Sequence, residues 1–277
     1  MSFESAQPMM PRAIWLLAAV FFGFAAGAED STRREAPSYS AASVVNSATN
    51  VVGDLAPNTI ATVYGVGLSY AVRALQVEDI QGGTLPTVLP STGVRVFIGS
   101  IGAQLYYVSP NQINFLIPCI FKPGETDLQI TLDGRAGPPV RIKLLDSAPA
   151  IFQLDQDTVI ATRPDGSLID KEKPATAGEV IVLYCTGLGP TEPEAIYGAL
   201  PTRAAPIKRI SEFKVFLNDV AVESNRVLYA GVTPGYAGLY QVNLRLPENL
   251  DADPRIRLVI GNQSSPAGVH LAARANK

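Results

Sequence analysis

The chain contains a single histidine and two cysteines among 277 residues. A Ser-His-acid triad would have to use His270, but the sequence places it between Val269 and Leu271 near the end of the last expected strand, without a nucleophile motif nearby. One histidine and two separated cysteines also supply too few ligands for a structural zinc site. The sequence therefore predicts no enzyme, no metal and no cofactor, and a hydrolase is the least favoured function.

Charged residues are also few, and the 22 basic and 25 acidic residues nearly balance. Charged residues make up 17% of the chain and the formal net charge is −3. Without a basic field a protein has nothing to hold a phosphate backbone, so nucleic acid is not an expected partner. The 23 glycines and 22 prolines interrupt the chain too often for long helices, while 47% hydrophobic residues suffice for sizeable cores. The length fits two domains.

Long apolar runs are absent except near the N-terminus. There Arg12 precedes the apolar residues 13–26, and Ala26-Gly-Ala28 forms a small-x-small cleavage pattern. The run is shorter than the roughly 20 residues that a membrane-spanning helix needs. We predict a signal peptide over 1–28 and a flexible leader over 29–43. The mature bacterial chain is then exported (secreted, periplasmic or at the cell surface), with no membrane span.

The clearest positive feature is an internal repeat. Gln112-Ile-Asn114 returns as Gln241-Val-Asn243, a shift of 241 − 112 = 129, and Tyr64 matches Tyr184, a shift of 184 − 64 = 120. Both Gln-x-Asn runs alternate apolar with polar residues, which is typical of a half-buried strand. We expect their Gln and Asn side chains to hydrogen-bond local backbone. The growing shift places insertions in loops, as in tandem domains.

Strands follow one another at short spacing, separated by glycine- and proline-containing turns. This pattern is typical of a β-sandwich. The fold class predicted is therefore all-β, with two tandem immunoglobulin-like β-sandwich domains over 44–152 and 153–277. The second domain begins with a hairpin whose turn we expect at Asp165-Gly166, in a type I′ conformation. Expected strands are 59–64, 93–98, 101–107, 112–117, 127–132, 140–145, 213–217, 240–246, 256–260 and 269–272, and the run 179–189 matches 60–69.

Two long connections, 68–92 and 189–211, occupy equivalent points of the two copies. Loops on a rigid scaffold commonly carry recognition, so these predict a binding surface. Tyrosines next to arginines suit sugar or protein recognition. The alternative is that each loop aromatic folds back on its own sandwich. The candidate ligand-binding residues, in or near these loops, are Tyr70, Arg73, Tyr197, Arg203 and Tyr236.

The two cysteines, Cys119 and Cys185, leave a disulfide open. An exported chain with an even cysteine count allows a bridge, which would tie the two copies together, whereas the alternative is two small buried hydrophobic side chains. The densest acidic stretch, 155–172, offers oxygen ligands for calcium, but its order does not match an EF-hand. A solvated hairpin explains this stretch better.

Several motifs in order resemble the uncharacterised C-terminal domain family of secreted Solibacter-type proteins, over about residues 44–273. The resemblance implies tandem IPT/TIG-like, immunoglobulin-like repeats, and it brings no catalytic residues. The family usually has Ala or Gly in place of Cys185, so it lends no support to a disulfide. The motifs are Leu55-Ala-Pro57, Tyr64-Gly-Val-Gly-Leu68, residues 105–115, Ala148-Pro-Ala-Ile-Phe152, residues 182–190 and residues 238–243.

Together these features predict a noncatalytic exported binding or surface-interaction module, acting in adhesion or protein–protein interaction. The alternative is a polysaccharide-binding module that uses the loop tyrosines. The expected partner is an extracellular protein or a polysaccharide.

Overall fold

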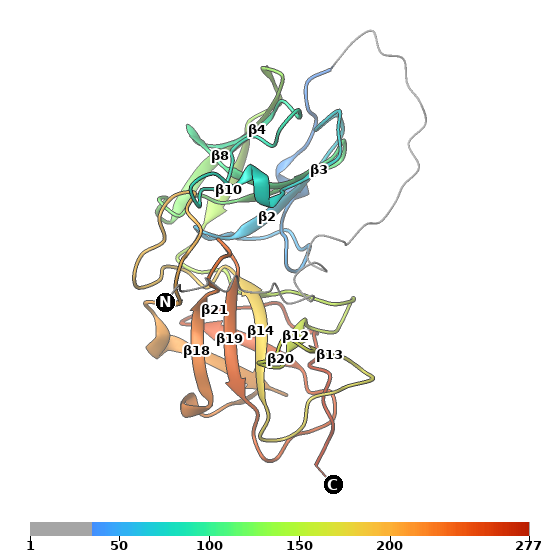
Figure 1. The fold of residues 1–277 in the computed structure, drawn as a ribbon, viewed down its shortest axis with the longest axis vertical. Coiled ribbons are helices and arrows are strands. Elements are labelled where there is room, and N and C mark those ends of the chain that lie inside the picture. Colours follow the sequence, from blue (N-terminus) through green and yellow to red (C-terminus); the bar gives the residue numbers. More distant parts are fainter. Residues whose placement is uncertain (1–34, 277) are drawn as a thin grey trace, which may run out of the picture.

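The computed structural model describes residues 35–276. Figure 1 shows two bodies stacked along the long axis, blue to green above and yellow to red below. Each is built from two antiparallel sheets. The prediction of an all-β fold with two tandem β-sandwiches is confirmed. The predicted signal peptide, 1–28, lies outside the described residues.

The first sandwich packs a sheet of order β1-β2-β7-β6-β3 against one of order β10-β8-β4-β5, with β9 on β8. Two short 3₁₀ turns, η2 (Ala41–Ser43) and η3 (Val77–Asp79), accompany it. The strands are β1 (Val44–Asn46), β2 (Ile60–Tyr64), β3 (Arg73–Ala74), β4 (Val94–Ile98), β5 (Ile101–Gly102), β6 (Gln104–Val108), β7 (Gln112–Leu116), β8 (Gly124–Leu132), β9 (Arg135–Ala136) and β10 (Val140–Leu144).

The second sandwich packs a sheet of order β13-β12-β14-β19-β18-β15, with β11 also on β14, against one of order β17-β16-β20-β21. Its 3₁₀ turns are η4 (Ile210–Glu212) and η5 (Ser224–Arg226). The strands are β11 (Ala150–Ile151), β12 (Ala161–Thr162), β13 (Leu168–Ile169), β14 (Val180–Thr186), β15 (Ala205–Pro206), β16 (Phe213–Leu217), β17 (Val220–Ala221), β18 (Val227–Val232), β19 (Tyr240–Arg245), β20 (Ile256–Ile260) and β21 (Gln263–Ser264).

Each sandwich has its own apolar core between its sheets. In β7, Ile113 and Phe115 are fully buried, whereas Gln112 and Asn114 on the other face stay partly exposed. This alternation follows from the period of two along a strand. Two smaller apolar clusters, around Ala48 and around Leu85, lie outside these cores and take in residues of both sandwiches.

The strand expected over 101–107, which would form a hairpin with 93–98, does so only over its first two residues. β5 pairs back with β4, but β6 pairs with β7 in the opposite sheet. The chain therefore changes sheets at Ala103, which is fully buried.

The hairpin expected at Asp165-Gly166 forms between β12 and β13, but its turn is not type I′. That turn needs positive φ at both central residues, and here only Gly166 has it, at 83°. The strand expected over 269–272 is reduced to isolated bridges of His270 with Thr158 and Arg255, which are too few for a continuous ladder.

The described part of the predicted flexible leader is packed against the first sandwich. Ser38 pairs with Val66 through two backbone hydrogen bonds of 3.0 and 2.9 Å. Tyr39 enters the core, and its hydroxyl accepts a hydrogen bond of 2.7 Å from the Ile130 amide. The polar composition of residues 29–43 predicted a flexible segment and gave no sign that Tyr39 would anchor it in the core. The domain boundary at 152/153 stays a prediction, although β11 already pairs with β14.

Candidate functional site

The two long loops meet each other at the seam between the sandwiches. The Leu85 amide donates to the Gly198 carbonyl and the Leu200 amide donates to the Gly83 carbonyl, both at 2.8 Å. Thr84 and Ala199 form an antiparallel bridge between these bonds. The backbone groups of the two loops therefore hydrogen-bond to each other, and this pairing joins the two sandwiches.

Two of the predicted ligand-binding tyrosines also lie at this seam. The Tyr197 hydroxyl donates to the Gly102 carbonyl of the first sandwich. Tyr236 packs against the small cluster that contains Ala48 and Tyr184. Burial raises the pKa of both the Tyr197 and Tyr236 phenols. Tyr197 therefore contacts the opposite sandwich rather than its own, and Tyr236 packs in a cluster with residues of both.

Hydroxyl groups from both sandwiches reinforce the seam. Thr186 Oγ1 accepts from the Ile60 amide at 3.1 Å and donates to the Gly238 carbonyl at 2.7 Å. The Tyr106 hydroxyl of the first sandwich donates to the Ala237 carbonyl of the second at 2.6 Å. Buried polar groups are costly when unpaired, so these bonds fix the two sandwiches against each other.

Tyr240 makes a further link from the second sandwich. It is almost fully buried, accepts from Asn58 Nδ2 at 3.1 Å and donates to the Gly189 carbonyl at 2.7 Å. Both bonds involve neutral groups, and burial raises the pKa of the Tyr240 phenol, which keeps it a donor at neutral pH.

The remaining predicted binding residues lie away from the seam or on its rim. The Tyr70 hydroxyl accepts from Arg135 Nη2 at 2.6 Å. Arg73 binds both carboxylate oxygens of Asp79 at 2.8 and 2.9 Å. Arg203 is exposed in the loop before β15. The five predicted residues are thus not brought together in one site.

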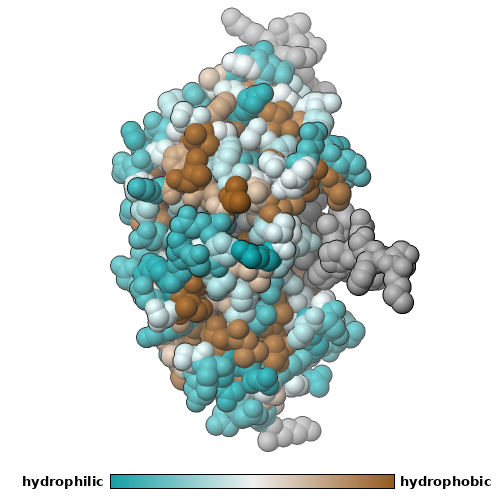
Figure 2. Space-filling view, turned by 60° about the vertical axis from the view of Figure 1, so that its left-hand side comes forward, coloured by the Kyte–Doolittle hydropathy of each residue, from teal (hydrophilic) through white to brown (hydrophobic). Residues whose placement is uncertain are grey.

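The end of the first sandwich farthest from the seam carries exposed apolar side chains. We call it the distal end. β2 starts at Ile60, which contacts Thr186 across the seam, and runs about 3.3 Å per residue away from it. At and beyond its end, Tyr64 is 38% exposed, Val66 74%, Tyr70 48% and Val72 63%. Figure 2 shows one face of the whole molecule, on which the apolar residues form separate patches rather than one continuous surface.

Neither cysteine is bonded in the structure. Both are free, so the disulfide that the sequence left open is not formed. Cys185 is buried in the second core with its thiol toward the Tyr240 carbonyl. Cys119 is partly exposed and its thiol donates to the Ala195 carbonyl at the seam. Burial raises the pKa of both thiols, which disfavours the reactive thiolate form.

The acidic stretch 155–172 is used in local turns. Asp155 Oδ1 accepts from the amides of Asp157 and Thr158, and Asp170 Oδ1 accepts from those of Glu172 and Lys173. Across residues 35–276, no group of three or more His, Cys, Asp or Glu side chains converges as metal ligands would. The carboxylates considered for calcium therefore cap turns, as the hairpin interpretation expects.

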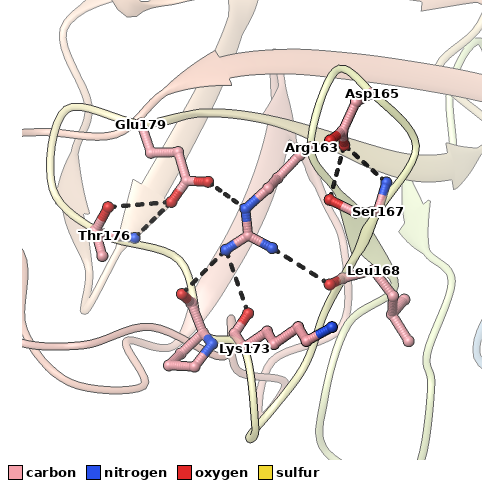
Figure 3. A network of polar contacts seen from close by, with 8 residues as sticks. Arg163, Asp165, Ser167, Leu168, Lys173, Thr176 and Glu179 are labelled. Atoms are coloured by element: carbon pink, nitrogen blue, oxygen red, sulfur yellow. Dashed lines mark hydrogen bonds and ion pairs between the residues drawn. The ribbon is translucent and has the colours of Figure 1, made fainter.

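Figure 3 shows how the same region is held together by Arg163. Its Nε pairs with Glu179 at 2.6 Å, and its two Nη groups donate to the carbonyls of Leu168, Lys173 and Pro174. Beside it, the Ser167 amide and hydroxyl donate to Asp165 and hold the pKa of that carboxyl below its usual range. One guanidinium thus organises the hairpin through its fixed fork of donors, which is a structural role.

The Gln-x-Asn runs of the two copies make the same contact. Gln112 Nε2 donates to Asn114 Oδ1 at 2.9 Å, and Gln241 Nε2 donates to Asn243 Oδ1 at 3.0 Å. The prediction that they would bond to local backbone is wrong. Residues two apart on a strand share a face, so the two amides reach each other directly.

No family model matches the chain, and no curated protein matches it. Among solved structures, it is similar to the Bacteroides ovatus mixed-linkage glucan utilization locus protein SGBP-B (10% identity, TM-score 0.31, covering 80% of this chain and 44% of that one). It is also similar to the surface glycan-binding protein PbSGBP-B of Prevotella bryantii (10%, 0.26, 77% and 36%) and to domains 5–6 of the S-layer protein SbsC (11%, 0.26, 81% and 93%).

The chain spans less than half the length of the two glycan-binding proteins. At these identities and TM-scores the likenesses carry no argument about function. Within residues 35–276, no helix has the length and hydropathy that crossing a membrane demands.

Proposed function

We propose that this chain is a noncatalytic, exported binding or surface-interaction module that engages its partner with the first sandwich. Export rests on the signal peptide predicted over 1–28. The family resemblance to Solibacter-type secreted domains is consistent with this role. Adhesion or protein–protein interaction is the first form of the proposal, and binding of a polysaccharide is the second.

The observation that supports the proposal is the unequal burial of equivalent positions. The repeat shift of 186 − 66 = 120 places Val66 on Thr186, and strand pairing agrees, because Ile60 on β2 and Val180 on β14 differ by the same 180 − 60 = 120. Thr186 is 0% exposed because the first sandwich covers it, whereas Val66 is 74% exposed. The same end of the fold is thus used for contact in one copy and open in the other.

The open end is also apolar. Val66, Tyr70 and Val72 lie within a short stretch of chain and are all exposed. Grouped exposed apolar side chains often mark interaction surfaces, whereas single ones are ordinary. An apolar surface with tyrosine is typical of protein recognition, which favours the first form of the proposal at this end.

A paired substitution tests this proposal. Changing Val66 and Val72 to Asn should weaken saturable binding of the labelled mature chain to bacterial cell envelopes by about tenfold or more, since each loses an apolar contact. The matched control changes Val220 and Leu228, exposed on the second sandwich at 70% and 50%, to Asn. Equal loss in both variants, or loss in the control alone, would place the contact elsewhere and contradict the proposal.

A further inference from the structure

Four side chains form a strip on the outer face of the first sandwich. They are Tyr64 on β2, Gln112 and Asn114 on β7, and Tyr107 on β6, and we call them the tyrosine–amide strip. Tyr64 lies opposite Gln112, and Tyr107 lies opposite Asn114. Three strands about 4.8 Å apart make the strip roughly 10 Å across.

The strip occupies only half of its sheet face. Nearer the seam the same face carries Ile60, Leu116 and Tyr106, which the apolar cluster with Leu85 and Ala237 covers. Away from the seam Tyr64 is 38% exposed, and the other strip residues are partly exposed. The second sandwich therefore closes one half of the face and leaves the strip beside it open.

The amide groups of the strip have a fixed orientation. Asn114 Oδ1 accepts from Gln112 Nε2 at 2.9 Å and from Thr62 Oγ1 at 3.1 Å. Thr62 is held in turn by the Ser47 hydroxyl at 2.7 Å. These bonds use Gln112 Nε2 and Asn114 Oδ1, which leaves Gln112 Oε1 and Asn114 Nδ2. No described side chain or backbone group forms a hydrogen bond with either of these two atoms. One donor and one acceptor thus remain on neighbouring outward positions of β7.

The flanking residues add aromatic rings and no charge. The Tyr64 hydroxyl donates to Asn50 Oδ1 at 2.9 Å, which fixes its ring at the edge of the strip. The nearest arginine on the adjoining strand β3, Arg73, is neutralised by Asp79. An uncharged ligand with a ring that packs on tyrosine and hydroxyls that both donate and accept satisfies all of these groups.

We infer that the tyrosine–amide strip binds a neutral polysaccharide. Adjacent hydroxyls of one sugar donate to Gln112 Oε1 and accept from Asn114 Nδ2, while its ring packs on Tyr64. This inference deepens the polysaccharide form of the proposed function and rests on it. It also places the polysaccharide site away from the loop tyrosines Tyr197 and Tyr236, whose side chains are used in contacts at the seam.

An extended peptide fits this face less well. Peptides that add to a sheet use unpaired backbone groups at an edge strand. β7 is an interior strand, paired with β2 on one side and β6 on the other. Recognition on the strip must therefore use side chains alone, and a chain of hydroxyl-bearing rings supplies the matching groups.

The second copy carries the same residue types, but one of its tyrosines is covered. Tyr184 lies opposite Gln241 and Tyr229 lies opposite Asn243, so the four residue types recur. Tyr184 is only 6% exposed, packed with Phe152 and Ile160. The Tyr229 hydroxyl is taken by the Ala205 amide and the Val232 carbonyl. The copies differ at the first tyrosine, since Tyr64 is 38% exposed, whereas Gln241 and Asn243 are partly exposed as Gln112 and Asn114 are.

Affinity gel electrophoresis of the mature chain tests the inference. The gels contain a soluble β-glucan, a xylan, a mannan or an α-glucan, with polygalacturonate as the acidic comparison. We expect retardation by at least one neutral polysaccharide, weakened about tenfold by Tyr64→Ala and by Asn114→Ala. Asn243→Ala removes the equivalent Gln–Asn bond of the second copy and should leave the affinity unchanged. Because Tyr64→Ala changes a partly exposed side chain at a strand end, it keeps the test valid if Asn114→Ala unfolds the protein.

Three results would overturn the inference. They are no retardation by any neutral polysaccharide, retardation by polygalacturonate alone, and retardation that neither Tyr64→Ala nor Asn114→Ala weakens. A different pair of results would overturn the proposed function itself. These are envelope binding by the double Val66 and Val72 variant that equals binding by the unsubstituted chain, together with no binding of any polysaccharide. Envelope binding lost on changing Val66 and Val72, without any polysaccharide binding, would reject the strip and keep the module.

Discussion

Replacing Gly238 by alanine should lower the free energy of unfolding by about 2–4 kcal/mol, from left-handed strain and overpacking together. Gly238 has φ +71°, and a Cβ there would lie 2.4 Å from Leu116 Cδ1 and 2.9 Å from Ile60 Cγ1. Leu116 is 3% exposed, so it has little space to yield. The added methyl would therefore push against the first sandwich directly.

Gly235 gives the matched control for this substitution. It lies in the same loop with φ +83°, but a Cβ there would meet nothing within 4 Å. Gly235→Ala should cost only about 1 kcal/mol, the strain of the backbone conformation alone. Urea unfolding of both variants measures the difference. Equal losses would mean that the sandwiches do not press together at Gly238.

Changing Thr186 to valine should lower the free energy of unfolding by about 2–5 kcal/mol, because two buried backbone groups lose their partner. The side chain keeps its shape but loses the hydroxyl that accepts from the Ile60 amide and donates to the Gly238 carbonyl. Thr186 is 0% exposed, so water cannot replace the hydroxyl without rearrangement. The effect should appear in the midpoint of denaturant unfolding.

Thr186→Ser is the control, since it keeps the hydroxyl and removes one methyl group. That deletion should cost about 1 kcal/mol. If serine and valine destabilise the chain equally, the hydroxyl bonds across the seam contribute nothing and the packing of the methyl group explains the effect.

Much of the strand pattern could be predicted from the sequence because it depends on alternation within short segments. β2, β4, β7 and β16 lie within a residue or two of their expected bounds, and the repeat fixed which strands correspond. The change of sheet at Ala103 could not be predicted, because alternation says which face of a strand is buried but not which strand pairs with it.

The candidate site could be predicted less well, since it depends on how the copies stack. The sequence identified the two long loops and their tyrosines, yet the surface that an aromatic ring covers is decided by tertiary packing. Tyr197 and Tyr236 fold into the seam for this reason. The tyrosine–amide strip did leave a signal in the sequence. Gln112 and Asn114 alternate with the apolar Ile113 and Phe115, so both had to face outward together, but their side chains were assigned to local backbone hydrogen bonds.

The paired loops and the hydroxyls of Thr186, Tyr106 and Tyr240 join the two sandwiches into one body, and we propose that the first sandwich is thereby left to bind the partner. Differential scanning calorimetry of the mature chain measures whether the sandwiches unfold as one body. We expect a single transition whose calorimetric and van't Hoff enthalpies agree, shifted as a whole to lower temperature by Thr186→Val. Two separate transitions, with Thr186→Val moving only one of them, would contradict it.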